Sequence, residues 1–225
     1  MSTHDPFDLA AMQQAVNYKR HILQKITASG AITDETLDLG AGRGDFAIAI
    51  KDHIGAAPIC AEIDPVSVDV LASAGLDVHQ SPDTIPSIKG LYSINVLEHI
   101  EDPASFLAQY TRRLQSGSSV FIYVPAHPSL FSEWDQRVGH FHRFTRCSIE
   151  AVVSAAGLQV IKSGYSDPVG AFVTWLMKTL RMAGRPLSPA SVRAFDRLAY
   201  PLSTLLEPVF RGFMGKNVWV MAVKP

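Results

Sequence analysis

Cysteine is scarce in this chain of 225 residues. Its two cysteines, Cys60 and Cys147, lie far apart and outside any C-x-x-C spacing. Cysteine-based zinc sites and disulfide frameworks need more thiols at closer spacing, so the sequence argues against both. The pattern is compatible with a reducing compartment, and we expect a cytoplasmic protein.

The chain also lacks a charge excess, a long apolar run and a secretory leader. The net charge is −1, with 47% apolar and 18% charged residues, as in globular proteins. Proteins that hold a phosphate backbone usually carry a basic excess, so nucleic acid is disfavoured as a partner. No window approaches about 18 uninterrupted apolar residues, so we expect no membrane span. Residues 1–11 lack the basic segment and apolar core of a signal peptide.

What the chain does have is an alternation of short apolar runs and helical patterns over its first 165 residues. Alternating strands and helices predict an α/β protein with a three-layer, doubly wound parallel sheet. We expect strands over Thr36–Leu39, Pro58–Ile63, Leu91–Val96 and Val120–Val124. We expect helices over Phe46–Ile54, Val66–Ala74, Pro103–Leu114 and Arg146–Ala156.

The two ends of the chain depart from this alternation. Leu9–Ile26 has the pattern of an amphipathic helix, and a strand is expected over Leu158–Gly164. Three apolar helices follow, interrupted by prolines 186, 189, 201 and 208: Val169–Met182, Ala190–Tyr200 and Leu202–Phe213. We expect one domain over 1–225, with a helical segment 1–30, a helical insertion 165–215 and a final strand 217–223. The insertion is open to four interpretations: core packing, a lid, a dimer surface or a membrane-surface patch.

Glycines recur at alternate positions between the first strand and the next helix, in Asp38-x-Gly40-x-Gly42-x-Gly44. Each glycine costs roughly 0.5–1 kcal/mol relative to alanine in regular structure, so three of them indicate a tight turn that approaches a ligand. A dinucleotide site would need glycine where the chain has Asp45, whose carboxylate would repel a pyrophosphate. The P-loop pattern is absent. A turn without a ligand remains an alternative.

Acidic residues end the second predicted strand. A carboxylate at such a strand end can accept hydrogen bonds from both hydroxyls of a ribose, each worth about 1.5–3 kcal/mol. Glu62 is the first candidate for this role. Asp64 is the second, although it could instead cap the helix that begins near Val66.

Three segments carry a family resemblance: 37–44, 62–64 and Ser93-Ile94-Asn95-Val96-Leu97-Glu98-His99-Ile100. They resemble successive motifs of class I S-adenosylmethionine-dependent methyltransferases, most closely the small-molecule group with Leu-Glu-His after strand four. The resemblance extends from about Tyr18 to Gly164. It implies a Rossmann-like, seven-stranded sheet with the last strand antiparallel. It also implies the cofactor S-adenosyl-L-methionine, released as S-adenosyl-L-homocysteine, lying across the ends of strands one, two and four.

The same resemblance assigns cofactor contacts to individual residues. It implies that Asp38 holds the amino-acid end, Glu62 the ribose, and Asn95 and Leu97 the methionine side. The acid that meets the adenine falls near Ser81 or Asp83, of which we take Asp83. The full set of expected cofactor-binding residues is Tyr18, Asp38, Gly40, Ala41, Gly42, Gly44, Glu62, Ile63, Asp83, Asn95 and Leu97.

The methyl acceptor is less clearly indicated. Enzymes of this fold that methylate base amines usually carry Asn/Asp-Pro-Pro-Tyr after strand four, whereas this chain has Asn95-Val96-Leu97-Glu98. We therefore expect an oxygen or carbon nucleophile of a small molecule. Aromatic residues such as Phe131, Trp134 and Phe141 would suit a hydrophobic acceptor, and the sequence leaves a homodimer open.

Four of the eight histidines lie between positions 99 and 142, near the expected ends of strands four and five. Histidine suits proton transfer near neutral pH, so we take His140 first, then His127 and His99, as catalytic candidates. Glu98 and Asp135 could orient one of them. His140-x-His142 lacks a third ligand nearby in sequence, so no metal site is expected. Gly139-His140-x-His142-Arg143 also resembles a bacterial subgroup of these enzymes.

Two other functions remain as alternatives to catalysis of methyl transfer. The first is a methyltransferase-like module that binds the cofactor without catalytic activity, because the glycine loop and Glu62 concern binding alone. The second is a nicotinamide-dependent oxidoreductase, which Asp45 disfavours.

Overall fold

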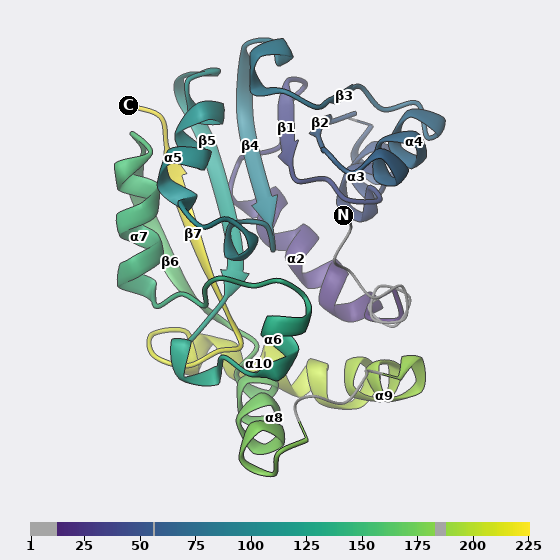
Figure 1. Ribbon diagram of the computed structural model, residues 1–225, viewed down its shortest axis with the longest axis vertical. Helices are drawn as coiled ribbons and strands as arrows, with labels where there is room; N and C mark the ends of the chain where they lie inside the picture. The colour runs from purple at the N-terminus through teal and green to yellow at the C-terminus, as the bar shows by residue number, and fades with distance from the viewer. Residues whose placement is uncertain (1–12, 56, 183–187) are drawn as a thin grey trace.

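A seven-stranded sheet forms the centre of the protein, whose computed structural model describes residues 13–55, 57–182 and 188–225 (Figure 1). The strands are β1 (Thr36–Leu39), β2 (Ile59–Ala61), β3 (Val78–His79), β4 (Ile88–Ile94), β5 (Leu114–Pro125), β6 (Gln159–Ser166) and β7 (Asn217–Val223). Their order across the sheet is β3-β2-β1-β4-β5-β7-β6. Strands β1 to β5 run parallel, and β7 pairs antiparallel with both β5 and β6. The predicted doubly wound sheet with its antiparallel last strand is confirmed.

Helices cover both faces of the sheet. The α-helices are α2 (Val16–Ala28), α3 (Asp45–Ile54), α4 (Pro65–Ser73), α5 (Pro103–Thr111), α6 (Glu133–Arg137), α7 (Arg146–Ala155), α8 (Pro168–Thr179), α9 (Pro189–Ala194) and α10 (Tyr200–Phe210). Short turns of helix are η1 (Pro82–Thr84), η2 (Leu97–His99), η3 (Pro128–Leu130) and the π-helical η4 (Phe195–Ala199). In Figure 1, α5 and α7 lie on one side of the strands and α2 and α3 on the other.

Alternation of side chains along β5 divides the core between the two faces. Val120, Ile122 and Val124 belong to the cluster that contains the apolar residues of α5 and α7. Phe121 and Tyr123 belong to a second cluster, with residues of α2 and α3. All five side chains are buried, so β5 is covered on both faces, as a central strand of a three-layer sheet must be.

The predicted helix over Pro103–Leu114 is too long at its C-terminal end. Asp102 caps its first turn as expected, accepting a hydrogen bond from the backbone N–H of Ser105 at 3.1 Å. The helix ends at Thr111, and Leu114 already pairs with Ile88 as the first residue of β5. The Arg113 guanidinium donates to the backbone oxygens of Pro82 and Asp83. These long-range contacts override the local helical pattern.

The proline breaks predicted in the insertion are only partly correct. Pro189 begins α9, and the expected break at Pro186 lies outside the described residues, as does the expected start of the N-terminal helix at Leu9. Pro201 does not interrupt the helical path, because it lies in the first turn of α10, directly after η4. Pro208 lies inside α10. A π-helical turn, η4, joins α9 to α10.

A buried acid, Glu207, ties the insertion to the rest of the protein. Its carboxylate contacts His21 and Lys25 of α2 and accepts a hydrogen bond from the Ser166 hydroxyl at 2.6 Å. Burial alone would raise the pKa of Glu207, but the hydrogen bond with His21 and the charge of Lys25 hold it at about 2. Because the carboxylate is ionised and paired, α10 is fixed against α2 and β6.

The apolar residues of α8 are not buried as their helical spacing would suggest. Phe172 is 55% exposed and Trp175 is 52% exposed, and their rings pack against each other at 5.8 Å between centroids. Further exposed apolar side chains in the insertion are Leu176, Leu180, Leu198, Leu202, Leu205, Val209 and Phe213. The described helices include none with the length and apolar character that crossing a membrane requires.

Gly90, in β4, packs so closely against the backbone of Ala31 that a larger residue there should destabilise the protein. A Cβ atom there would lie 2.0 Å from the backbone oxygen of Ala31, which a side-chain movement cannot relieve. Gly90→Ala should therefore lower the free energy of unfolding by about 1–3 kcal/mol or more, measured by denaturant titration. Gly212→Ala is the control, since no described atom lies within 4 Å of its added Cβ. Equal stability of the two variants would contradict this packing.

Candidate functional site

The candidate site lies at the C-terminal ends of β1, β2, β4 and β5. In the sheet order β3-β2-β1-β4-β5, the direction of winding reverses between β1 and β4. Open α/β sheets bind ligands at such a reversal, beyond the carboxyl ends of the strands. In Figure 1 this edge faces α6 and the helices of the insertion.

The glycine turn after β1 is fixed against its neighbours. The N–H groups of Gly40 and Ala41 both donate to the Ala61 oxygen, at 2.9 and 3.2 Å. Gly40 has φ +77°, and a Cβ there would lie 2.4 Å from the Val96 Cγ2. At Gly42, with φ +54°, an added Cβ would have no described atom within 4 Å. The turn therefore packs closely against Val96 at Gly40 and leaves free space at Gly42, as a ligand-binding turn requires.

Glu62 lies at the end of β2 with its carboxylate held toward this turn. Its Oε2 accepts a hydrogen bond from the Gly42 N–H at 2.7 Å. Its Oε1 accepts from the N–H groups of Ile63 and Asp64 at 2.8 and 2.9 Å. A carboxylate offers about four acceptor positions, so three bonds leave room for one hydroxyl rather than the two that the sequence suggested.

The alternative acid, Asp64, has a structural role. It is the N-cap residue of α4, and its Oδ2 accepts hydrogen bonds from the backbone and the hydroxyl of Ser67 at 3.0 and 2.9 Å. Ile63, between the two acids, is 76% exposed. An exposed apolar side chain beside Glu62 offers a surface for a planar ring. The geometry favours Glu62 over Asp64 as the ligand-binding acid.

Asp38, in β1, has a buried carboxylate, and little in its surroundings offsets the cost of burying its charge. Its Oδ2 accepts a hydrogen bond from the Tyr92 hydroxyl at 2.9 Å. Burial raises the pKa of Asp38 to about 7, with a smaller contribution from the charge of Glu62, although the Tyr92 hydrogen bond opposes the shift. A buried acid that is difficult to ionise would be stabilised by a nearby cationic ligand.

Asn95 and Tyr18 meet at the end of β4. Asn95 has φ +55°, in the left-handed region, which places strain in a non-glycine residue. Its Nδ2 lies 3.5 Å from the Tyr18 hydroxyl, and its buried Oδ1 has no hydrogen-bond partner in the described part of the chain. An unpaired buried acceptor beside an open turn indicates a ligand that donates a hydrogen bond there.

The insertion positions Tyr18. The Asp196 carboxylate, in η4, accepts hydrogen bonds from the backbone N–H groups of Asn17 and Tyr18, both at 2.9 Å. It thus satisfies donors of the first turn of α2 that no local side chain caps. Burial raises the pKa of Tyr18 to about 12, so its hydroxyl keeps its proton.

The three remaining expected cofactor contacts lie on different elements. Leu97 is buried in the core beneath the end of β4. Asp83 lies on η1 with an exposed carboxylate, 3.5 Å from the guanidinium of Arg113. Gly44, the last glycine of the turn, is the N-cap residue of α3 and has φ +86°.

On the β5 side, His140 is held by a chain of charged groups. The Asp135 Oδ1 lies 2.8 Å from the His140 Nδ1 and accepts a hydrogen bond from the Arg143 Nε at 2.8 Å. Burial alone would raise the pKa of Asp135, but the His140 hydrogen bond and the charge of Arg143 hold it at about 2. Because this carboxylate is ionised, the His140 Nδ1–H donates to it. The lone pair of a neutral ring is then on Nε2.

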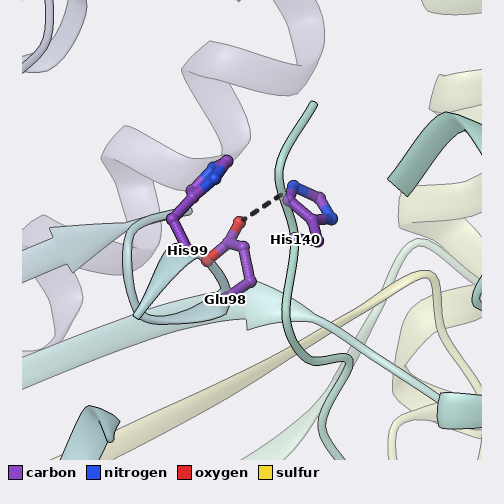
Figure 2. A group of neighbouring side chains, drawn as sticks. All are labelled: Glu98, His99 and His140. Atoms are coloured by element: carbon purple, nitrogen blue, oxygen red, sulfur yellow. Dashed lines mark ion pairs between the residues drawn. The ribbon is translucent and has the colours of Figure 1, made fainter. Parts of the chain in front are cut away.

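Glu98 and His99 lie opposite His140. Figure 2 shows the three side chains together, Glu98 and His99 from η2 and His140 from the loop after α6. The Glu98 Oε1 is 4.0 Å from the His140 Nε2, and the rings of His99 and His140 meet edge to face at 4.7 Å. Burial raises the pKa of Glu98 to about 8, although its own backbone N–H and the charge of Arg143 oppose the shift.

His127 lies apart from this arrangement. Its ring stacks on that of Tyr165, with centroids 4.6 Å apart and planes inclined by 15°. Its backbone has φ +59°, and its N–H donates to the Phe144 oxygen at 2.9 Å. Burial lowers the pKa of His127, with a further contribution from the charge of Arg143. The structure therefore brings together two of the three candidate histidines, His99 and His140.

Sequence reasoning missed two residues that support the site. Arg143 is buried and orients Asp135, while Asp196 orients the first turn of α2. The spacing Gly139-His140-x-x-Arg143, in which Arg143 follows His140 closely, was a signal for the first. The link from Asp196 to residues 17 and 18 spans nearly the whole chain and leaves no sequence signal.

Together these groups form a candidate ligand site at the carboxyl ends of the strands of an α/β protein. Asp38 suits the ammonium group, Glu62 suits a ribose hydroxyl, and the open turn at Gly42 admits a ligand. Residues 12–163 match the methyltransferase domain family, and the chain belongs to that family. It is an S-adenosylmethionine-dependent methyltransferase. No curated protein matches it in sequence.

Solved structures have the same fold at low identity. A SAM-dependent methyltransferase from Thermotoga maritima has a TM-score of 0.65 and 15% identity, covering 95% of this chain and 92% of that one. A Haloferax volcanii protein solved with the Trm112 methyltransferase activator has a TM-score of 0.60 and 16% identity, covering 99% of each chain. Phosphoethanolamine N-methyltransferase 2 of Haemonchus contortus, solved with S-adenosyl-L-methionine, has a TM-score of 0.58 and 15% identity, covering 91% and 52%.

Proposed function

We propose that the protein transfers a methyl group from S-adenosylmethionine to an oxygen or carbon nucleophile of a small molecule. One observation carries this proposal: ionised Asp135 holds the His140 Nδ1, so that the other ring nitrogen, Nε2, lies 4.0 Å from the Glu98 Oε1 at the end of β4. A histidine fixed in this way can act on the acceptor's reactive atom. The segment Asn95-Val96-Leu97-Glu98 after β4 lacks the prolines that are typical of enzymes that methylate base amines.

S-adenosylmethionine, when bound, supplies a methyl group that is already activated for displacement. The protein then has to bind the cofactor, align the acceptor's nucleophilic atom with the methyl group and remove water from that atom. In this proposal Asp38, Glu62 and Asn95 hold the cofactor, with Tyr18 and Ile63 beside it. His140 has a side chain that is only 6% exposed, so water has little access to its ring. The exposed Phe172 and Trp175 support an acceptor with an apolar part.

The role of Glu62 can be tested against that of Asp64. Glu62→Ala removes a charged acceptor for a ribose hydroxyl, worth about 1.5–3 kcal/mol, so affinity for S-adenosylmethionine should fall about 10–150-fold. Asp64→Ala should cost about 1 kcal/mol of stability through the lost N-cap and leave affinity nearly unchanged. Calorimetry with S-adenosylmethionine measures both. Undiminished binding by Glu62→Ala would remove that residue from the site.

A further inference from the structure

Glu98, His99 and His140 form a compact set of metal-ligand atoms. One ligand atom from each residue lies within 4.8 Å of the other two. His99 and Glu98 are neighbours on η2, whereas His140 comes from the loop after α6, so the set is assembled by the fold (Figure 2). Sequence spacing suggested only His140 and His142, which share no third ligand near them in the chain.

Two of the three side chains present lone pairs toward this set. The His140 Nδ1–H is engaged by Asp135, so Nε2 can act as an electron-pair donor. Glu98 is 1% exposed, and its Oε2 has no hydrogen-bond partner among residues 13–55, 57–182 and 188–225. A buried carboxylate oxygen without a partner is costly unless something occupies the space before it. A bound cation would satisfy it.

We propose that Glu98, His99 and His140 bind a divalent transition-metal cation. Two imidazole nitrogens and one carboxylate oxygen suit Zn²⁺ and its neighbours in the series, whereas Mg²⁺ prefers oxygen ligands alone. Three protein ligands also leave at least one coordination position open. His99 is only partly buried, which leaves a route to that position on its side of the set.

The surroundings hold the three ligands in place without an ion. The backbone oxygen of Glu98 accepts hydrogen bonds from the N–H groups of Phe141 and His142, at 2.7 and 3.3 Å, which join the loop to η2. Asp135, fixed by Arg143, is the carboxylate partner that metal-bound histidines usually have. Ligand atoms on one tetrahedral Zn²⁺ lie about 3.4 Å apart, so the side chains need to move inward only slightly.

The open coordination position specifies a class of acceptor. A cation there would bind a hydroxyl or enol oxygen and lower its pKa, so that its proton would pass to solvent. The oxygen would then form a bond to the methyl carbon as the methyl–sulfur bond of S-adenosylmethionine breaks and S-adenosyl-L-homocysteine leaves. This role rests on the proposed function, whereas the cation site itself does not. With a cation bound, His140 would act on the acceptor through the cation, as a ligand. Without a cation, its Nε2 is the atom that can accept the acceptor's proton directly, so loss of His140 slows methyl transfer in both cases.

The site can be tested on the full chain by calorimetry with ZnCl₂ after removal of bound metal with a chelator. The wild-type protein should bind one equivalent. Glu98→Gln, His99→Ala and His140→Ala should each weaken binding at least tenfold. His142→Ala is the matched control, because its ring contacts the Glu101 backbone oxygen and lies outside the set. This variant should bind Zn²⁺ as tightly as the wild type.

Binding of S-adenosylmethionine by the same variants shows that they fold and separates the two proposals. Variants that bind the cofactor normally but have lost Zn²⁺ support the cation site. No stoichiometric Zn²⁺ binding by the wild type, or equal binding by Glu98→Gln and His140→Ala, would overturn it. Failure to bind S-adenosylmethionine would count against the methyltransferase function and leave the Zn²⁺ result to be judged by itself.

Discussion

His140→Ala is expected to slow methyl transfer by about 10²–10⁴-fold while leaving affinity for S-adenosylmethionine unchanged. The reason is that the His140 ring contacts Asp135, Glu98 and His99, and within the described part of the chain it makes no contact with the glycine turn. The measurement is a screen of hydroxylated and carbon-nucleophile acceptors with methyl-labelled cofactor. His79→Ala, a histidine on β3 paired with Asp77 and Thr84, is the control.

The Asp135→Asn variant tests whether activity depends on how the His140 ring is held. An amide at position 135 cannot hold the charge that keeps the His140 Nδ1–H in place, so activity should fall even though the His140 ring is intact. Full activity in His140→Ala would remove His140 from the mechanism. A wild-type protein that binds cofactor and methylates none of the acceptors would favour a binding module.

Asp38→Asn should make the free protein more stable and its cofactor binding weaker. The pKa of Asp38 is raised from 3.8 to about 7, so the folded protein holds a proton that the unfolded chain releases. Stability therefore falls as the pH rises from about 4 to about 7 and levels off above that range. At pH 8 the variant should exceed the wild type by roughly 2–4 kcal/mol in free energy of unfolding.

The same substitution removes the charge that would face the cofactor's ammonium group. Affinity for S-adenosylmethionine should fall at least tenfold at pH 8. In the wild type, affinity should decline below about pH 7 as Asp38 takes up its proton, and the variant should lack that decline. Denaturant titration and calorimetry across pH measure the two effects. A variant less stable than the wild type at pH 8 would contradict the burial argument.

Local sequence signals predicted much of the fold. Asp102 and Thr145 cap helices α5 and α7, and Gly55 and Gly75 follow α3 and α4 with positive φ, all close to the predicted helix ends. These features depend on neighbouring residues, so a sequence contains them. The start of β5 depends on tertiary contacts, so its predicted position was wrong. The break predicted at Pro201 was also wrong, because the helical path continues from η4 into α10.

The residues of the site also fall into two groups, those that local sequence spacing identified and those that only the fold brings together. The glycine turn and Glu62 lie on consecutive segments of one strand–helix–strand unit, so their spacing identified them. The cluster of Glu98, His99 and His140 joins residues about 40 positions apart, and Arg143 acts only through Asp135. Which histidines meet depends on how the loop after β5 folds back onto η2. Spacing alone grouped His140 with His142, whereas the fold groups it with His99.

A crystal structure of the protein with S-adenosyl-L-homocysteine tests the account most directly. The account predicts the ribose at Glu62, the amino group near Asp38 and the sulfur directed toward the space before His140 and Glu98. A sulfur atom that faces away from His140, or a ribose far from Glu62, would contradict it.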